Sequence, residues 1–337
     1  MDLSVVICTW NRSKTLPGVL ASLEKCVVPP AIQWEVVIVD NNSTDDTRNV
    51  CQAFVNKHPG TFRYIFEARQ GKSFAQNTGI QNASGEIIAL TDDDVAVDSN
   101  WIAELHKAFL EHDCAGIGGR IIPRWTCPKP DWLGLDTRWH HPAYGAIVRF
   151  EKGDSPFVLD VTAVGANLAF RRSVFAKHGF FRTDLSGNHA DHRRLGDLLG
   201  GEDTEYCRRI MNAGEKIVYA PRAVVHHPAE ANRVNKKYLQ TFAFHYGRYI
   251  CRIHGVPEEA RCIFGIPRYM YPWVLTNCVK WVFAFDPRRR AYYRMETWFT
   301  FGEMAEGKRC VRQRGAISAG AKIQPAGDPP PAPSRTL

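Results

Sequence analysis

The feature that most constrains the fold is an alternation of short apolar runs with amphipathic segments over the first 120 residues. Apolar runs of this length predict buried strands, and the longer segments with apolar residues every three or four positions predict helices. Such alternation is typical of βαβ units. We therefore expect an α/β fold with a mostly parallel, Rossmann-like sheet flanked by helices. The expected strands are 3–9, 34–39, 62–66 and 86–90, and the expected helices are 14–26, 46–58, 73–82 and 101–112.

Polar residues follow three of these expected strands at the point where each strand ends. They lie at 9–12, at 40–44 and at 92–94. Ligands of open parallel sheets bind beyond the carboxyl ends of the strands. The sequence therefore predicts a single site to which all three segments contribute.

The third of these segments, Asp92-Asp93-Asp94, places three carboxylates directly after a buried run. Carboxylates this close repel one another, so a raised pKa or a bound cation is expected. Mg²⁺ and Mn²⁺ accept carboxylate oxygens as ligands. An acidic turn that caps the next helix is the alternative. The strand before the aspartates and the polar segments at neighbouring strand ends favour the metal site.

The charge is distributed unevenly along the chain. Residues 1–232 carry 25 Lys and Arg against 28 Asp and Glu, whereas residues 233–314 carry 16 against 6. We expect an α/β domain over 1–232, a basic, aromatic, helical extension over 233–314 and a disordered tail rich in Pro, Ala and Gly over 315–337. The basic extension indicates an anionic partner, such as phospholipid, a lipid phosphate or nucleic acid. Nucleic acid is disfavoured because acidic residues dominate the rest of the chain.

Ten cysteines are scattered without a C-x-x-C pair, which argues against a zinc site and is typical of reduced thiols in a cytosolic protein. The N-terminus lacks the basic region and long apolar run of a signal peptide. A cytoplasmic protein is therefore expected.

Two segments have more than one interpretation. Residues 124–156 hold three tryptophans, four prolines and His140-His141, and they form either a specificity loop across the site or an anchored connection. Residues 273–285 are apolar on most faces and precede three arginines, but no run is long and apolar enough to span a membrane. This helix either lies in a membrane interface or packs on the α/β domain.

Seven motifs in a fixed order resemble those of the family 2 glycosyltransferases. The resemblance implies a GT-A type nucleotide-sugar-binding fold and an inverting glycosyltransferase domain over residues 1–232. The motifs are SVVICTWNR (4–12), VVIVDNNSTD (36–45), QGKSFAQNTG (70–79), TDDD (91–94), GANLAFRR (165–172), GGEDTE (200–205) and PRAVVHH (221–227).

The resemblance also implies roles for individual residues. Asp203 is expected as general base beside Glu202, and Mn²⁺ or Mg²⁺ as the ion. His227 is preferred over His226 as a ligand because neighbouring side chains of a strand face opposite ways. Asp40 is expected to accept a hydrogen bond from the uracil imide or a ribose hydroxyl. The expected donor-site residues are Thr9, Trp10, Arg12, Asp40, Asn42, Arg69, Lys72, Asn77, Asp92 and Asp93, and the expected metal ligands are Asp94, Asp92 and His227.

These roles predict a nucleotide diphosphate sugar as donor, with UDP-sugars preferred and GDP- or dTDP-sugars as alternatives. The expected acceptor is a glycan or lipid-linked hydroxyl at the inner face of the membrane, and a soluble acceptor is the alternative. A sugar nucleotidyltransferase is disfavoured because no Gly-rich basic loop follows the first strand. A nucleotide-sugar-binding protein without transferase activity is disfavoured because all the carboxylates are present.

Overall fold

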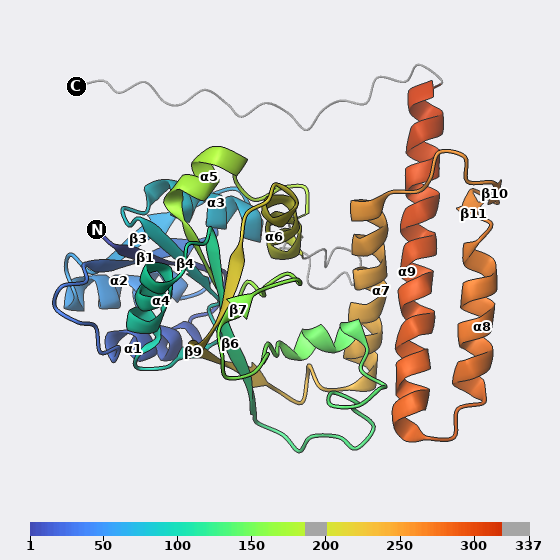
Figure 1. Ribbon diagram of the computed structural model, residues 1–337, viewed down its shortest axis with the longest axis horizontal. Helices are drawn as coiled ribbons and strands as arrows, with labels where there is room; N and C mark the ends of the chain where they lie inside the picture. Colours follow the sequence, from blue (N-terminus) through green and yellow to red (C-terminus); the bar gives the residue numbers. More distant parts are fainter. Residues whose placement is uncertain (186–200, 319–337) are drawn as a thin grey trace.

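A computed structural model describes residues 1–185 and 201–318 of the chain (Figure 1). Within these residues, a nine-stranded sheet has the strand order β3-β2-β1-β4-β8-β6-β9-β5, and β7 (Phe157–Val158) pairs with β9. Helices cover the sheet, and a separate group of C-terminal helices stands beside it (Figure 1). The α/β class and the helical C-terminal region predicted from the sequence are both confirmed.

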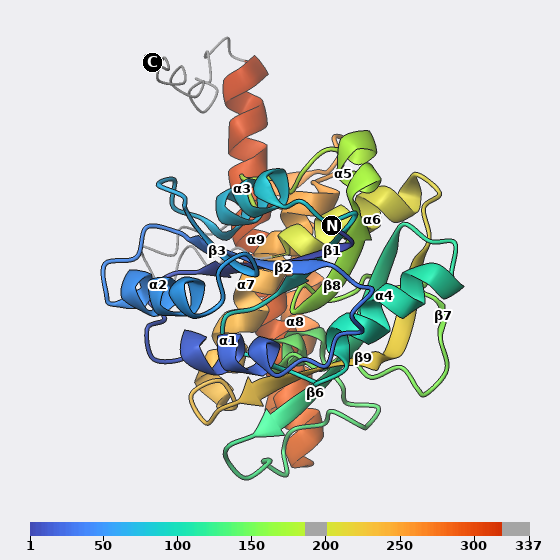
Figure 2. The same ribbon diagram turned by 90° about the vertical axis from the view of Figure 1, so that its left-hand side faces the viewer.

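The first half of the sheet is parallel. Its strands pair in the order β3, β2, β1, β4, and their predominantly apolar sequences are covered on both faces, as parallel strands require. Figure 2 shows α3 and α1 on opposite faces of these strands. All eight predicted elements are present, with ends within two residues of those expected. They are β1 (Leu3–Thr9), α1 (Leu16–Glu24), β2 (Trp34–Asp40), α2 (Thr47–Lys57), β3 (Phe62–Phe66), α3 (Lys72–Asn82), β4 (Ile87–Thr91) and α4 (Trp101–Glu111).

The second half of the sheet is mixed. Here β8 (Asn167–Arg171) runs antiparallel to both β4 and β6 (Gly116–Trp125). Strand β9 (Ile217–Ala229) is parallel to β6 and antiparallel to the two-residue β5 (Ala96–Val97). The predicted parallel arrangement thus holds over β3-β2-β1-β4 and again between β6 and β9, and antiparallel pairs form the rest of the sheet. Helix α5 (Arg172–His178) follows β8 directly.

Asn167 links the strands of the mixed half to one another and to α4. Its side chain is fully buried, accepts a 2.8 Å hydrogen bond from the Trp101 indole, and donates to the carbonyls of Arg120 (2.9 Å) and Ala223 (2.8 Å). One side chain therefore links β8 to α4, β6 and the β9 segment. Satisfied buried amides of this kind favour one unique packing over competing arrangements.

The C-terminal helices form their own packed unit. Helix α9 (Pro287–Ser318) lies between α7 (Lys236–His254) and α8 (Met270–Val282), with a small hairpin of β10 (Cys262–Ile263) and β11 (Ile266–Pro267) at one end (Figure 1). A Cβ atom on Gly302 would lie 1.9 Å from the Phe244 carbonyl oxygen, and one on Gly247 would lie 2.0 Å from that of Phe299. Glycines are therefore required where α7 and α9 cross.

Helix α9 extends to Ser318, so residues 315–318 of the predicted disordered tail are helical. The remainder of that tail, 319–337, lies outside the described residues, as does the loop at 186–200. No helix in the described ranges has the length and apolar character needed to cross a bilayer.

The Trp-rich segment 124–156 packs against the C-terminal helices. It contains a 3₁₀ helix (Pro142–Ile147), whose buried residues share a core with residues of α7 and α9. His141 is buried, and its Nε2 lies 3.4 Å from a carboxylate oxygen of Glu296 on α9. These contacts support the anchored-connection interpretation of the segment.

Glu303 on α9 generates a prediction about stability. Burial, with a contribution from Glu296, raises the pKa of Glu303 to about 7 from its ordinary value of 4.5. Because the folded-state pKa lies above the unfolded value, the stability from this carboxyl group is fully present below pH 4.5 and is lost as the pH rises through about 7.

We expect Glu303→Gln to remove this pH dependence. Between about pH 5 and about pH 8, the wild type should lose on the order of 1 kcal/mol more unfolding free energy than the variant. Urea denaturation at both pH values measures this, with Glu111→Gln on an exposed face of α4 as control. Parallel pH profiles for wild type and Glu303→Gln would contradict the prediction.

Candidate active site

The loops that follow β1 and β2 are interlocked through Asn11. Its backbone N–H donates to the Ser43 hydroxyl (2.9 Å), and its side-chain oxygen accepts from the Thr44 N–H (2.7 Å). Asn11 has φ 52°, a left-handed conformation that asparagine tolerates better than most residues. The carboxyl ends of β1 and β2 are thereby held together at one edge of the sheet.

Asp40, at the end of β2, is only 1 % exposed. One carboxylate oxygen accepts from the Ser43 N–H (3.0 Å) and the other from the Tyr64 hydroxyl (2.9 Å). A base edge would reach this carboxylate only after the Tyr64 hydroxyl shifts. Asn42, by contrast, is exposed in the left-handed region, with φ 63°.

Two of the predicted donor-site residues are held by protein partners. The Arg69 guanidinium makes paired hydrogen bonds to Glu67 (2.9 and 2.8 Å) and lies over the Phe74 ring. The Asn77 amide bonds to both the N–H and the carbonyl of Phe181. These contacts order the surrounding loops, and the structure does not bring either residue onto the aspartate cluster.

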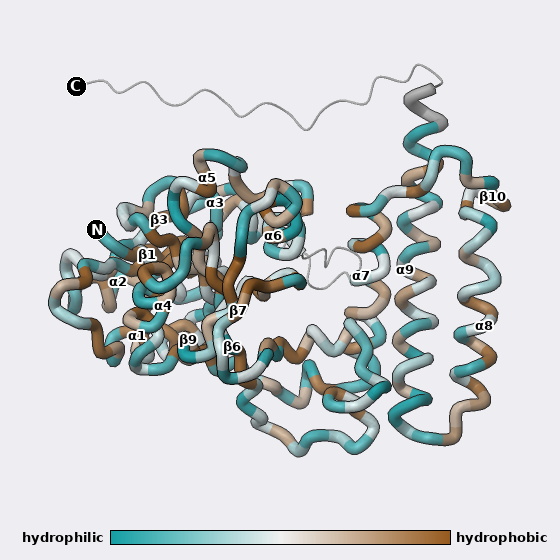
Figure 3. The backbone as a smooth tube through the Cα atoms, viewed as in Figure 1, coloured by the Kyte–Doolittle hydropathy of each residue, from teal (hydrophilic) through white to brown (hydrophobic). Residues whose placement is uncertain are grey.

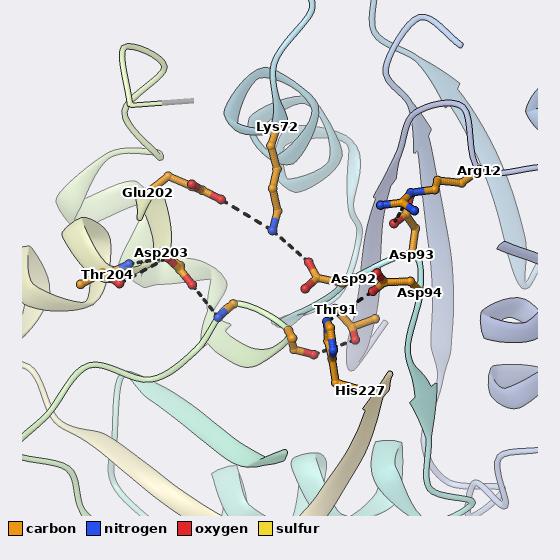
Figure 4. A network of polar contacts seen from close by, with 12 residues as sticks. Arg12, Lys72, Thr91, Asp92, Asp93, Asp94, Glu202, Asp203, Thr204 and His227 are labelled. Carbon is orange, nitrogen blue, oxygen red and sulfur yellow. Dashed lines mark hydrogen bonds and ion pairs between the residues drawn. The ribbon is translucent and has the colours of Figure 1, made fainter. Parts of the chain in front are cut away.

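Asp92, Asp94 and His227 come together at the end of β4. One potential ligand atom from each lies within 4.8 Å of the other two. His227 comes from β9, where it is buried, whereas His226 is paired in register with Ala96 of β5 and is not part of this group. Figure 4 shows the two aspartates and the imidazole on facing elements.

His227 is prepared to act as a ligand. Its Nδ1 lies 3.1 Å from the Pro228 carbonyl, which can only accept, so Nδ1 carries the hydrogen and Nε2 presents its lone pair toward Asp94 (3.5 Å). Burial lowers the pKa of His227 although Asp94 and Asp92 oppose the shift. The imidazole is therefore held neutral, the form in which it binds metals.

Arg233 is a site residue that the sequence analysis missed. From the segment between β9 and α7, its guanidinium donates to Asp94 at 2.8 Å. No local pattern marks it, because the two residues are 139 positions apart. Two carboxylate oxygens and an imidazole nitrogen fit a divalent cation, and the nitrogen favours Mn²⁺ over Mg²⁺. When the ion binds, Arg233 would either keep its hydrogen bond to Asp94 alongside the ion or lose that hydrogen bond.

Lys72, the first residue of α3, connects the metal group to the start of α6 (Glu202–Asn212). Its ammonium lies 2.9 Å from Asp92 and 3.6 Å from Glu202, as Figure 4 shows. Burial would lower the pKa of Lys72, but the neighbouring carboxylates raise it well above its ordinary value. Lys72 thus remains charged and neutralises part of the cluster.

Asp93 points toward the loop that follows β1. Burial raises its pKa to about 6, although the Arg12 guanidinium, whose Nε lies 3.6 Å away, and the Thr9 side chain limit the rise. Trp10 is partly buried in the same loop. Thr9, Trp10 and Arg12 are therefore gathered at the same strand end as the aspartates, as predicted.

Glu202 and Asp203 are neighbours in different environments. Glu202 is 4 % exposed, and burial raises its pKa although Lys72 opposes the shift. Asp203 is more accessible, and its two oxygens accept from the N–H groups of Gly165 (2.7 Å) and Thr204 (2.7 Å). Asp203 is therefore oriented by the backbone and keeps lone pairs available for a proton.

Helix α7 fixes the start of α6. Gly201 precedes α6 with φ 102°, and a Cβ atom there would lie 2.4 Å from the Tyr249 ring. The Tyr249 hydroxyl donates to the Gly201 carbonyl at 2.9 Å. The C-terminal unit therefore contacts the segment that carries Asp203.

The mixed sheet and its flanking helices have the fold of the GT-A glycosyltransferases. The carboxylates and the histidine lie at its strand ends, and the partly buried Asp203 lies on α6. The chain belongs to glycosyl transferase family 2, whose sequence model matches residues 4–179. Together with the relatives below, this membership identifies a glycosyltransferase and supports a nucleotide-sugar donor.

Three similar proteins illustrate the range of the match. A glucosyl-dolichyl phosphate glucuronosyltransferase from Haloferax volcanii is 25 % identical over 73 % of this chain and 75 % of its own. A mannosyltransferase from Pyrobaculum calidifontis, solved with GDP-Man and Mn²⁺, superposes with a TM-score of 0.53 at 18 % identity, covering 96 % of this chain and 77 % of its own. GalNAc-T7, solved with UDP, GalNAc and Mn²⁺, superposes with a TM-score of 0.52 at 18 % identity. The match covers 73 % of this chain and 50 % of the chain of GalNAc-T7.

The contact between Arg233 and Asp94 predicts the effect of Arg233→Met. Removing a cation that competes for the carboxylate should tighten binding of Mn²⁺ alone roughly three- to tenfold. Isothermal titration with MnCl₂ measures this without any donor or turnover. Arg222→Met is the control, because Arg222 pairs with Glu104 on α4. Unchanged or weaker Mn²⁺ binding in Arg233→Met would show that the two cations do not compete.

Proposed function

We propose that the protein is a metal-dependent inverting glycosyltransferase that moves a sugar from a nucleotide diphosphate sugar to a hydroxyl of a glycan or lipid-linked acceptor. The observation that carries the proposal is the grouping of Asp92, Asp94 and His227 beside the accessible, backbone-oriented Asp203. Family membership supports sugar transfer as the reaction.

In this proposal Asp92, Asp94 and His227 hold the ion, with Mn²⁺ preferred and Mg²⁺ as alternative. The bound ion supplies Lewis-acid stabilisation of the departing diphosphate. Lys72 and Arg233 add two further positive charges at the same place. Both cations are partly buried and held by carboxylates, so the fold already positions them beside the place where a diphosphate would bind.

Asp203 is proposed as the general base. It accepts the proton of the acceptor hydroxyl while that oxygen attacks the anomeric carbon, and the bond from that carbon to the diphosphate oxygen breaks. Attack from the face opposite the leaving group inverts the configuration without a covalent intermediate. Glu202 is the weaker candidate for the base because it is buried and faces Lys72, so an acceptor hydroxyl reaches it less easily than Asp203.

The donor is proposed to be a UDP-sugar, with GDP- and dTDP-sugars as alternatives. Thr9 and Asp40 offer hydrogen-bonding groups that suit a pyrimidine edge, provided that Tyr64 releases Asp40. Two proteins that share this fold were solved with GDP-Man and with UDP, so the fold itself selects neither nucleotide.

The acceptor is proposed to be lipid-linked, with a soluble acceptor as the rival. Support comes from the similar Haloferax volcanii enzyme, whose name specifies a dolichyl phosphate-linked acceptor. The location proposed for the enzyme is the cytoplasmic face of the membrane, since that is where a lipid-linked acceptor and the basic C-terminal unit would meet.

Asp203→Asn tests the assignment of the base. The amide preserves the size of the side chain but cannot accept the proton, so the rate of sugar transfer should fall by roughly 10²–10⁴ while nucleotide-sugar affinity stays near wild type. The matched control is Glu205→Gln, one position past Thr204 on the same helix, where the carboxylate pairs with Arg209. A variant that keeps most of its turnover would move the role of base to another residue.

A thermal-shift panel tests the donor and the ion together. UDP-, GDP- and dTDP-sugars are compared with Mn²⁺, with Mg²⁺ and after EDTA treatment. We expect the largest stabilisation from a UDP-sugar with Mn²⁺, and Asp94→Asn should remove the part that depends on the metal. Stabilisation by GDP-sugars alone would contradict the proposed donor. Sugar transfer that survives removal of the metal would contradict the proposed metal dependence.

A further inference from the structure

Helix α8 carries a band of exposed apolar side chains that we call the α8 face. It comprises Leu275, Val279, Val282 and Phe283, which are 48–66 % exposed. Large apolar residues exposed singly are ordinary, but a contiguous group marks an interaction site. We propose that the α8 face is a docking surface for an anionic lipid bilayer and that α8 lies parallel to the membrane plane.

The four residues occupy one side of the helix because their spacings of four, three and one keep them within about 100° of one another. Helix α9 covers the opposite side, and Met270 is the single residue of α8 that is buried. Figures 1 and 3 place α8 as the outermost helix, on the side of the molecule away from the sheet. The α8 face therefore points away from α9, on which α8 packs.

Further apolar side chains lie near both ends of the α8 face. Phe264, at the tip of the β10–β11 hairpin, is 86 % exposed, and Phe285, just after α8, is 92 % exposed. Trp273 is also exposed on α8. Aromatic residues on a helix of this kind suit the boundary between headgroups and acyl chains.

Charge identifies the occupant as an anionic surface. Residues 261–290 contain six Lys and Arg residues against one acidic residue, Asp286. Lys280 is exposed on α8 itself, and Arg290 is exposed in the first turn of α9. Each basic residue near an anionic bilayer adds on the order of 1 kcal/mol of attraction. A second copy of the chain would bring two positive faces together, so it fits the charge poorly.

The dimensions of α8 require it to lie in the plane of the membrane. Its 13 residues span about 20 Å, less than the ~30 Å hydrocarbon core of a bilayer. A helix that lies in the interface buries one apolar face and keeps its charges in the headgroup layer. Lys280, the single charged residue of α8, is exposed and fits that arrangement.

Docking at the α8 face deepens the proposed function, because it would bring the enzyme to a lipid-linked acceptor. Helix α8 packs on α9, α9 packs on α7, and Tyr249 of α7 bonds to Gly201 beside Asp203. The docking itself does not depend on the enzyme's chemistry. A loss of vesicle binding can therefore be distinguished from a loss of nucleotide-sugar binding, and the two proposals can be tested separately.

The test is flotation of the full chain with vesicles of phosphatidylcholine alone or mixed with phosphatidylglycerol. We expect binding to the mixed vesicles, weakening in high salt and with phosphatidylcholine alone. The double variant Leu275→Ser, Phe283→Ser should bind roughly tenfold more weakly or worse. Leu110→Ser is the matched control, since Leu110 is 75 % exposed on α4, within the sheet domain. Lys280→Glu, compared with Lys107→Glu, tests the charge.

Melting temperatures and Mn²⁺-dependent nucleotide-sugar shifts are measured on the same variants. Lost flotation with unchanged melting and unchanged donor shifts supports the proposal. Equal flotation of the double variant and the Leu110→Ser control would overturn it, as would no flotation of the wild type on mixed vesicles. A dimer in light scattering that the double variant dissolves would assign the face to self-association instead.

Discussion

Repulsion among the three consecutive aspartates that follow β4 is the constraint on which the site depends. Each carboxylate is paired with a cation from a different element: Lys72 for Asp92, Arg12 for Asp93 and Arg233 for Asp94. The pairs therefore hold the loop after β1, the start of α3 and the segment after β9 around one strand end. Without these cations the cluster would open or take up protons: burial raises the pKa of Asp93 even with Arg12 beside it, and Asp94 and Asp92 add to the rise.

The parallel half of the sheet could be predicted because each of its strands and helices is specified by a pattern of neighbouring residues. Apolar runs at 3–9 and 34–39 can form only buried strands, and the segments between them have one apolar face each. Strand β6 was not predicted because glycines at 116, 118 and 119 resemble a loop. The structure gives the reason for them: a Cβ atom on Gly119 would lie 2.2 Å from the Asn167 amide nitrogen. Small residues there serve packing, which no local pattern reveals.

Residue types at the site could be read from the motifs, but their partners could not. The sequence analysis named Asp40 without Tyr64, Arg69 without Glu67 and Asp94 without Arg233. Each partner lies outside the seven motifs, and Arg233 is 139 positions from Asp94. Asn41 is a further example, because its side chain bonds to the backbone of Glu67, Arg69 and Gly71 and shapes that loop.

The position of Asp203 depends on two glycines for opposite reasons. Gly165 lets its own N–H reach the carboxylate, because a Cβ atom there would lie 2.8 Å from the Asp203 oxygen. Gly201 supplies the left-handed turn and the space into which the Tyr249 ring packs. The first glycine lies in the turn just before β8 and the second contacts Tyr249 of α7, so Asp203 is held by both structural units. Any partner that binds the helical extension therefore binds a unit in direct contact with the segment that carries the proposed base.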